Sequence, residues 1–279
     1  MQPLVMGVVN VTPDSFSDGG RYLERDAAVA HGLELVRQGA DVIDVGGESS
    51  RPGAVPVAEA EELHRVVPVI EALAPHVRVS IDTVKPGVAR AAVAAGATLV
   101  NDTSASLWAV AAECDVGWVA MHMQGSPSTM QRDPRYGDVV AEVRAYLLER
   151  AASARDAGVR EVWVDPGIGF GKTTAHNLSL LKHLPALVAE GFPVLVGTSR
   201  KAFLGQLASG GGEATAPVSE RLAGTIATVT WAMLAGVSMV RVHDVACAAQ
   251  AANLVGETRL GDSATDRATV GSAPARAVR

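Results

Sequence analysis

The chain has 279 residues, of which 48% are hydrophobic, 4% aromatic and 19% charged, and its formal net charge at pH 7 is −6. This length suffices for one large core and is common for an α/β barrel that forms a single domain. The acidic balance argues against nucleic acid as a partner, and every apolar run falls well short of the ~20 residues of a membrane span.

The cysteines and the N-terminal segment bear on the compartment. Cys114 and Cys247 lie in Ala-rich, helix-like surroundings. Lone cysteines of this kind are typical of buried thiols in a reducing compartment, not of a disulfide framework or a zinc site. Residues 1–10 show no basic segment ahead of an apolar run, so they do not resemble a signal peptide. We therefore expect a cytoplasmic protein without a membrane partner.

Strand-like apolar runs alternate with Ala-rich amphipathic segments. The expected strands are Val5–Asn10, Val42–Val45, Val77–Asp82, Leu99–Asp102, Trp118–His122, Val162–Asp165, Val194–Gly197 and Met239–His243. The expected helices are Asp26–Gln38, Ala58–Leu73, Pro86–Ala95, Leu107–Cys114, Asp138–Ala157, Ala175–Glu190, Ser219–Ala235 and Val245–Glu257. This alternation predicts a parallel sheet, and eight strand–helix units are the number that closes a (β/α)8 TIM barrel.

A doubly wound open sheet is the structural alternative. Against it, no G-x-G-x-x-G segment opens the first expected helix, and polar residues end nearly every strand. Small-residue turns follow many of the helices, while the long loops follow the strands, which places the active site at the C-terminal ends of the strands. We expect the barrel to span residues 1–257. The tail, residues 258–279, has little apolar periodicity and is expected to be disordered.

The sixth expected strand leads into a Gly-rich segment, VWVDPGIGFGK at Val162–Lys172. Pro166 has no N–H for a ladder, so strand pairing should end there and leave Asp165 at the tip of the strand. The three glycines that follow allow the backbone to turn and to approach a ligand closely. Taken alone, a strand-to-helix turn with a surface aspartate explains this segment equally well.

Polar side chains end nearly all of the expected strands. In chain order they are Asn10, Asp44, Glu48, Asp82, Asn101, Asp102, His122, Asp165, Ser199, Arg200, Lys201, Arg241 and His243. In a barrel these strand ends converge on one mouth. A single polar residue at a strand end is more often a helix cap or a turn former, but its repetition along the chain favours a shared active site.

The middle strands supply one kind of chemistry. Asp82, Asn101 and Asp165 offer acceptors and an amide, which suits a planar heterocycle that presents several N–H donors.

The last strands supply another kind. Arg241 and His243 point to the same side of one strand. Together with the segment Ser199–Lys201 they form a cationic corner, where barrels often hold phosphate. A salt-bridged strand end that faces Asp244 is the alternative for this pair.

Eight segments share their sequence and order with one enzyme family. They are MGVVNVTPDSFSDGG at Met6–Gly20, DVGGESSRPGA at Asp44–Ala54, SIDT at Ser80–Thr83, VNDTS at Val100–Ser104, MHMQGSPSTMQ at Met121–Gln131, DPGIGFGK at Asp165–Lys172, VGTSRKAFLG at Val196–Gly205 and RVHDV at Arg241–Val245. Through them the chain closely resembles the dihydropteroate synthases of the folate pathway. These transferases condense 6-hydroxymethyl-7,8-dihydropterin pyrophosphate with p-aminobenzoate to 7,8-dihydropteroate and pyrophosphate. The resemblance implies a (β/α)8 barrel, Mg2+ dependence and a homodimer.

The resemblance also implies roles for individual residues. The implied pterin-binding set is Asp82, Asn101, Met121, Asp165 and Lys201. The implied diphosphate-binding set is Asn10, Ser50, Arg51, Arg241 and His243, with Asn10 also helping to hold the Mg2+. The residues implied to contact p-aminobenzoate are Phe16, Phe170, Ser199 and Lys201. The implied catalytic residues are Asp82, Lys201, Arg241 and His243.

Two other functions stay open at this point. A methyltetrahydrofolate-dependent methyltransferase would share the pterin-binding acids and amides but would not need a diphosphate clamp. A catalytically silent relative would bind a pterin without turning it over. The paired Arg241 and His243 argue against the first, and the intact motifs argue against the second.

Overall fold

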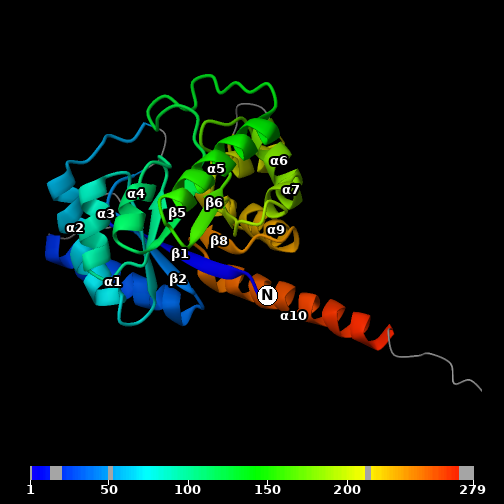
Figure 1. Ribbon diagram of the computed structural model, residues 1–279, viewed down its shortest axis with the longest axis horizontal. Coiled ribbons are helices and arrows are strands. Elements are labelled where there is room, and N and C mark those ends of the chain that lie inside the picture. The colour runs from blue at the N-terminus through cyan, green and yellow to red at the C-terminus, as the bar shows by residue number, and fades with distance from the viewer. Residues whose placement is uncertain (1, 13–20, 50–52, 211–214, 270–279) are drawn as a thin grey trace, which may run out of the picture.

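The computed structural model of the protein describes residues 2–12, 21–49, 53–210 and 215–269, with the backbone alone for residues 21–24 and 258–269. Strands and helices alternate along the chain (Figure 1). The strands are β1 Leu4–Asn10, β2 Val42–Gly46, β3 Arg78–Asp82, β4 Leu99–Asp102, β5 Gly117–Met121, β6 Val162–Asp165, β7 Leu195–Val196 and β8 Met239–Val242. The helices are α1 Arg21–Arg37, α2 Glu59–Leu73, α3 Pro86–Ala94, α4 Trp108–Glu113, α5 Val139–Asp156, α6 Thr174–Lys182, α7 Leu184–Val188, α8 Ala202–Ala208, the 3-10 helix η2 Val218–Glu220, α9 Leu222–Leu234 and α10 Val245–Thr269.

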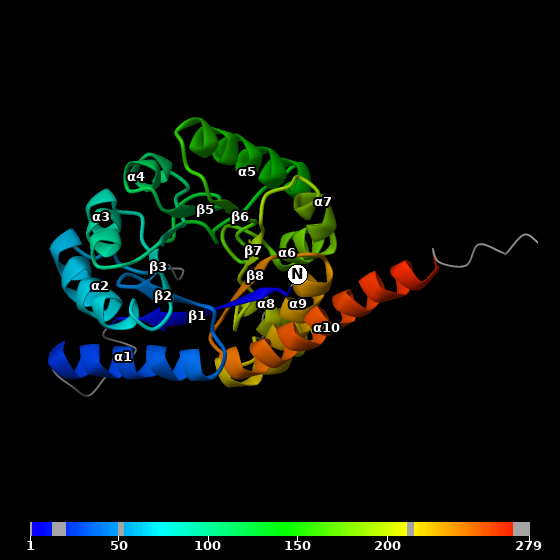
Figure 2. The same cartoon turned by 60° about the horizontal axis from the view of Figure 1, so that its bottom comes forward.

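The strands form one parallel sheet in the order β6-β5-β4-β3-β2-β1-β8-β7. A parallel bridge between Val164 and Val194 brings the two edges of this sheet together. Helices surround the strands, as the view in Figure 2 shows. The prediction of an eight-stranded barrel is confirmed, and the open-sheet alternative is wrong.

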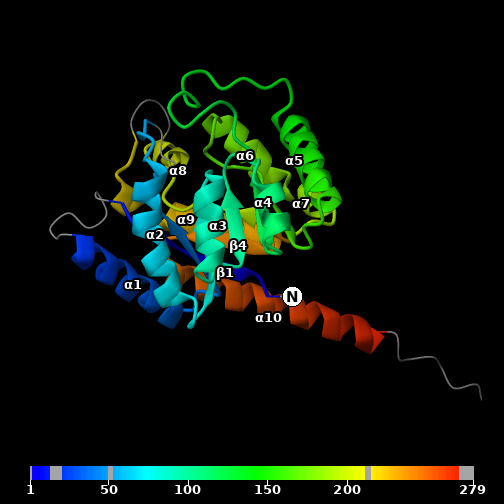
Figure 3. The same ribbon diagram turned by 60° about the vertical axis from the view of Figure 1, so that its left-hand side comes forward.

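Three helical segments differ from the prediction. The helix expected over Ala175–Glu190 is two helices, α6 and α7, because Pro185 stands in the first turn of α7 and cannot donate the backbone bond that would continue α6. The segment expected as a loop after β7 contains α8. Helix α10 continues to Thr269, although we expected disorder after Glu257, because a helix started on the barrel gains a hydrogen bond with each added residue. Its last turns extend away from the barrel (Figure 3). The domain boundary at residue 257 stays a prediction.

A layer of apolar side chains fills the interior of the barrel. This interior layer comprises Met6, Val42, Leu99, Val119, Trp163, Leu195 and Met239, all from strands. Most of the other apolar side chains of the strands pack with the helices in a second, larger cluster. Side chains alternate between the two faces of a strand, so a residue two positions beyond the interior layer also points into the barrel. This step places five polar or sulfur-containing side chains on the C-terminal side of the layer: Asp44, Asn101, Met121, Asp165 and Arg241.

The opposite face of the barrel has the tight turns that the sequence predicts. Gly96 follows α3 with a φ of 113°, a left-handed conformation that favours glycine. A Cβ at this position would lie 2.6 Å from the Cβ of Ala74, so a larger residue would also displace the neighbouring helix end. The long connections therefore lie on the other face, at the C-terminal ends of the strands.

The cysteines are unpaired. Cys114 is partly buried and Cys247 is exposed. The expectation of two buried thiols is therefore wrong for Cys247, because the side of α10 that packs on the barrel presents Val245 and Ala248 instead. Among the helices that the structure describes, none is long and apolar enough to cross a membrane.

Candidate active site at the carboxyl ends of the strands

Arg241 lies at the centre of a charged network in the mouth of the barrel. Its Nε donates to Oδ2 of Asp44 at 2.6 Å, and its Nη2 donates to Oδ2 of Asp82 at 2.8 Å. Asn101 donates from Nδ2 to the same oxygen of Asp44 at 2.9 Å. The structure therefore brings together three residues to which the sequence assigned binding roles. It adds Asp44, which ended a strand in the sequence but received no role. The sequence did contain a signal for this residue: Asp44 lies two positions beyond Val42 of the interior layer, so its side chain points into the barrel.

The acids of this network are largely shielded from water: Asp44 is fully buried, and the side chain of Asp82 is 12% exposed. Burial raises the pKa of Asp82 to about 7, an effect that the positive charge of Arg241 opposes and the negative charge of Asp44 reinforces. Burial disfavours the charge of Arg241, but the carboxylates of Asp44 and Asp82 raise its pKa. Asp44 is fully buried, and its Oδ1 has no hydrogen-bond partner in the described part of the chain. Because Asp44 is enclosed, the carboxylate of this network that a ligand in the mouth can reach is that of Asp82, whose side chain is partly exposed.

Asn10 lies beside this network at the end of β1. The side-chain oxygens of Asn10 and Asp82 each lie 3.8 Å from the point where a Cβ on Gly46 would stand. The two side-chain oxygens therefore both lie close to Gly46, although Oδ2 of Asp82 also accepts from Arg241. Oxygen donors of this kind suit a hard divalent cation. The described residues contain no group of three or more histidine, cysteine or acidic side chains that could hold a metal by themselves.

Ser199 and His243 meet where β7 and β8 end. Ser199 Oγ lies 2.9 Å from Nδ1 of His243 and accepts the backbone N–H of His243 at 3.1 Å. Arg200 does not join them, because its Nε and Nη2 form bonds of 3.0 and 2.6 Å with the carboxylate of Asp244. The alternative that pairs Arg241 with Asp244 is wrong. Of the corner that we predicted, Ser199, Lys201, Arg241 and His243 lie together, whereas Arg200 bonds to Asp244.

Asp165 and Lys201 lie at the ends of β6 and β7, next to the Arg241 network. Asp165 is buried at the end of β6, and its Oδ1 accepts the backbone N–H of Gly167 at 2.7 Å. Burial raises the pKa of Asp165, and the positive charge of Lys201 opposes that rise. Lys201 Nζ donates to the carbonyl of Ile168 and lies 4.5 Å from the centre of the Phe170 ring. Burial lowers the pKa of Lys201 to about 8. The lysine thus joins the predicted pterin side of the site to the aromatic ring predicted to contact p-aminobenzoate.

A second lysine, Lys172, stands behind the same loop. It is 3% exposed, and its Nζ lies 2.9 Å from Nδ1 of His122. Burial lowers the pKa of Lys172 to about 7. Burial, with the charge of Lys172, lowers the pKa of His122 to about 3, so the imidazole is neutral at pH 7. Lys172 ends one motif of the sequence and His122 ends one expected strand, but nothing in the sequence indicates that the two side chains meet.

Four further residues were predicted to contact the substrates, and the structure describes one of them, Met121. Phe16, Ser50 and Arg51 lie outside the described residues. Met121 is buried at the end of β5, two positions beyond Val119 of the interior layer. Its side chain therefore faces the mouth, as expected for a residue beneath a flat ligand.

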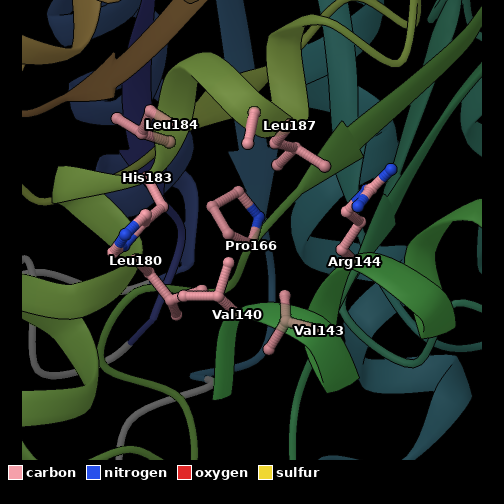
Figure 4. Close-up of a pocket in the computed structure, with 9 residues that line it drawn as sticks. Val140, Val143, Arg144, Pro166, Leu180, His183, Leu184 and Leu187 are labelled. Atoms are coloured by element: carbon pink, nitrogen blue, oxygen red, sulfur yellow. The ribbon is translucent and has the colours of Figure 1, made fainter. Parts of the chain in front are cut away.

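One cavity lies behind the end of β6, outside the barrel wall (Figure 4). Pro166 forms part of its wall. The rest is mainly apolar side chains of α5, α6 and α7, including Val140, Leu180 and Leu187. Its volume of about 20 Å³ has room for little more than a water molecule. It is too small for a substrate and belongs to the packing of the helices.

Comparison with known proteins identifies relatives over nearly the whole chain. The family of pterin-binding enzymes matches residues 6–243. The dihydropteroate synthase of Mycobacterium leprae is 48% identical over 261 residues, which cover 90% of this chain and 92% of that protein. The dihydropteroate synthase of Escherichia coli K12 is 45% identical over 264 residues, which cover 92% of each chain.

Solved structures give the same result. The Xanthomonas albilineans dihydropteroate synthase with 4-aminobenzoic acid has a TM-score of 0.85 and 47% identity, over 92% of this chain and 93% of that chain. The same enzyme in complex with 7,8-dihydropteroate has a TM-score of 0.82 and 45% identity, over 92% and 94% of the two chains.

Proposed function

This chain belongs to the pterin-binding enzyme family, among the dihydropteroate synthases, and from this premise we propose how its residues divide the reaction. The enzyme condenses 6-hydroxymethyl-7,8-dihydropterin pyrophosphate with p-aminobenzoate to 7,8-dihydropteroate and pyrophosphate. The single observation that carries the division of roles is the network of Arg241 with Asp44 and Asp82 in the barrel mouth.

The pterin ring is assigned to the acidic side of the mouth. Asp165 supplies buried carboxylate oxygens and Asp82 partly buried ones, and each carboxylate can accept hydrogen bonds from neighbouring ring N–H groups. Asn101 holds Asp44 through its Nδ2, so its Oδ1 is oriented as a further acceptor. Met121 supplies an apolar surface for the flat ring, and Lys201 supplies a donor.

The diphosphate is assigned to Arg241, His243 and Asn10, and the family resemblance assigns Ser50 and Arg51 to it as well. Nε and Nη2 of Arg241 donate to the carboxylates of Asp44 and Asp82, while Nη1 has no hydrogen bond to the described residues. It can therefore donate to a phosphate oxygen while Asp44 and Asp82 fix its orientation.

The reaction replaces the C–O bond at the pterin methylene with a C–N bond. The electron pair of the C–O bond leaves with pyrophosphate, whose negative charge Arg241 and His243 stabilise. The positive charge left on the methylene and ring is stabilised by Asp82 and its neighbouring carboxylates. The nitrogen of p-aminobenzoate forms the new bond and then releases a proton. An arylamine is already neutral at pH 7, so no strong base is needed to activate it.

We also propose that the enzyme needs Mg2+. When bound, the ion would neutralise part of the diphosphate charge. The side-chain oxygens of Asn10 and Asp82, which both lie close to Gly46, are donors that suit such an ion. Mg2+ is commonly held by one or two protein oxygens together with substrate phosphates. A small protein contribution from Asn10 therefore suffices if the diphosphate supplies the other ligands.

p-Aminobenzoate is assigned to the side of Phe170 and Ser199, with Lys201 between the two substrates. The cation over the Phe170 ring fixes one wall of this pocket. Phe16 is proposed to contribute from the loop after β1.

We propose a cytoplasmic homodimer. The compartment is supported by the absence of a disulfide among the described residues, where both cysteines are free. The dimer is supported by an apolar face on α9, where Trp231 is 54% exposed and Leu234 is 63% exposed. Ala227, Trp231 and Leu234 follow at helical spacing and line a shallow apolar groove with Pro185 of α7. Contiguous apolar surface of this kind usually marks an interface, and we assign it to a second copy of this chain.

One experiment tests the reaction. Purified protein should release pyrophosphate from the pterin pyrophosphate only when p-aminobenzoate is present, and addition of a chelator should abolish this release until Mg2+ is restored. A methyltransferase would show no release. A silent pterin-binding protein would bind the pterin in a calorimetric titration without turnover.

A further inference from the structure

The loop between β6 and α6 is held by side chains along its whole length. Five consecutive backbone carbonyls, from Gly167 to Gly171, each accept a hydrogen bond from a side chain elsewhere in sequence or at the loop's end. The donors are Lys172 to Gly167 and Phe170, both at 3.0 Å, Lys201 to Ile168, Gln131 to Gly169 at 2.6 Å, and Tyr136 to Gly171 at 2.8 Å. Loops usually expose such carbonyls to water, so this one is fixed in an unusual way.

Lys172 makes more of these contacts than any other side chain of the set. Besides the two loop carbonyls, its Nζ lies 3.2 Å from the carbonyl oxygen of His122 and 2.9 Å from Nδ1 of that residue. Every direction around the nitrogen is therefore taken by protein atoms. A buried lysine of lowered basicity could serve as a nucleophile or base, but this one has no side left for a substrate. Lys172 therefore acts by holding the backbone of the loop.

The loop is also packed tightly against the segment after β5. A Cβ on Gly167 would lie 1.8 Å from the carbonyl oxygen of His122, and a Cβ on Gly171 would lie 2.5 Å from that of Gln124. The loop thus rests on this segment, and Lys172 bonds to both. Its ammonium joins the two backbones at the place where they meet.

Phe170 is the side chain that depends on this arrangement. Its carbonyl is bonded to Lys172, and its ring lies under the ammonium of Lys201. Without Lys172, the Gly-rich backbone on both sides of Phe170 has many other conformations available.

We propose that Lys172 is a positioning residue, which holds the Gly167–Gly171 loop in the conformation that presents Phe170 to p-aminobenzoate. This inference rests on the proposed assignment of Phe170 to the p-aminobenzoate pocket. The residue does not touch the substrate. Its loss should change the affinity for p-aminobenzoate more than the affinity for the pterin, because the backbone of Asp165 is paired in strand β6 and a single hydrogen bond, from Gly167, joins its carboxylate to the loop.

The test compares Lys172→Met with Lys182→Met, a matched control at an exposed lysine of α6. Three quantities are measured in each protein: the KM for p-aminobenzoate, the Kd of the pterin pyrophosphate by calorimetry, and amide hydrogen exchange of peptides spanning residues 165–172 without ligand. For Lys172→Met we expect a KM at least 10-fold higher, a Kd within 3-fold of wild type, and faster exchange confined to these peptides. The control should match wild type in all three.

Two results would overturn the proposal. One is unchanged exchange in Lys172→Met, since the lysine would then not hold the loop. The other is equal weakening of both substrates, which would indicate general damage to the site. If wild-type protein shows no turnover, the proposed function itself fails, whereas the exchange measurement still reports on the loop.

Should Lys172→Met fail to fold, Tyr136→Phe tests the same loop with less loss of stability. It removes only the hydroxyl that donates to the Gly171 carbonyl. We expect a KM for p-aminobenzoate about 3-fold higher and faster exchange in the same peptides. If this variant changes neither, the idea that side-chain bonds to this loop set the p-aminobenzoate pocket is wrong.

Discussion

The guanidinium of Arg241 reaches across strand β1 to the carboxylate of Asp44, with 2.6 Å between Nε and Oδ2. Asp44 is fully buried, and Arg241 is the cation that pairs with it. The arginine proposed to receive the leaving group is therefore also a structural cation of the mouth, and its removal should have two separable effects.

Arg241→Ala should lower stability and should weaken diphosphate ligands selectively. Removal of one partner of a buried ion pair costs about 3–5 kcal/mol. Loss of a charge-assisted contact to the diphosphate should reduce affinity by roughly 2–3 kcal/mol, or about 30- to 150-fold. Calorimetric titration with the pterin pyrophosphate, with pyrophosphate and with a pterin that lacks the diphosphate measures the selectivity, with Mg2+ present.

The matched control is Arg200→Ala, since Arg200 pairs with Asp244 away from the network. It should keep wild-type affinity for all three ligands. If Arg241→Ala weakens the diphosphate-free pterin as much as the pyrophosphate ester, the diphosphate assignment has to be given up.

Asp165 can be tested by two substitutions that separate its roles. Asp165→Asn keeps an oxygen that can accept the N–H of Gly167, whereas Asp165→Ala does not. Both remove the carboxylate, and each ring N–H left without an acceptor costs roughly 1–3 kcal/mol. We expect both variants to bind the pterin at least about 10-fold more weakly. If Asp165→Asn binds normally in calorimetry, Asp165 acts only in the turn.

Lys201 should affect both substrates, because it lies between the Ile168 carbonyl and the Phe170 ring. Lys201→Ala should raise the KM for p-aminobenzoate and the Kd of the pterin pyrophosphate, each by about 10-fold or more, as expected for loss of a charged donor. Steady-state kinetics and calorimetry measure the two values. A variant with lower Tm and unchanged affinities would instead make Lys201 a structural residue.

His122 predicts a pH dependence of stability. Its pKa is about 3 in the folded protein, against 6.5 for an unperturbed histidine. Between these values the unfolded chain binds the proton and the folded chain does not, so the free energy of unfolding falls as pH is lowered from about 6.5 toward 3. The contribution of this group has a limiting slope of about 1.4 kcal/mol per pH unit. Urea titrations of wild type and His122→Gln over this range should show the shallower slope in the variant. Parallel curves would show that His122 does not cause the dependence.

The apolar face of α9 predicts the oligomeric state. Trp231→Glu places a charge in the centre of the proposed dimer interface, and sedimentation should shift from dimer to monomer. Leu178→Glu is the control, because it changes an exposed leucine on α6 that does not line the groove. A wild-type protein that sediments as a monomer would remove the dimer proposal, and the exposed tryptophan would then need another explanation.

The barrel and the strand ends were predictable because both follow from local pattern. Asp165 stands between an apolar run and a proline, and the two-residue periodicity of strands says which side chains share a face. The contact of Lys172 with His122 was not predictable in this way. It joins residues from two separate motifs, and their meeting depends on how two loops pack. Asp44 was predictable only in part. The sequence showed that it stands at a strand end, but not that it pairs with Arg241, which is far away in the chain. Helix α8 was missed because Gly-rich sequence around it suggested a loop.

The two-residue step from the interior layer to the mouth has a consequence for how this protein can change. In β6, Trp163 faces the interior, Val164 faces the helices and Asp165 faces the mouth. Deleting Val164 would move Asp165 into a position whose side chain contacts the helices, placing a carboxylate in the outer core and a proline at the strand tip. A substitution changes one side chain, but a deletion of one residue reverses the facing of every later residue in the strand. Natural variation in the mouth should therefore consist of substitutions, with insertions and deletions confined to the loops beyond it.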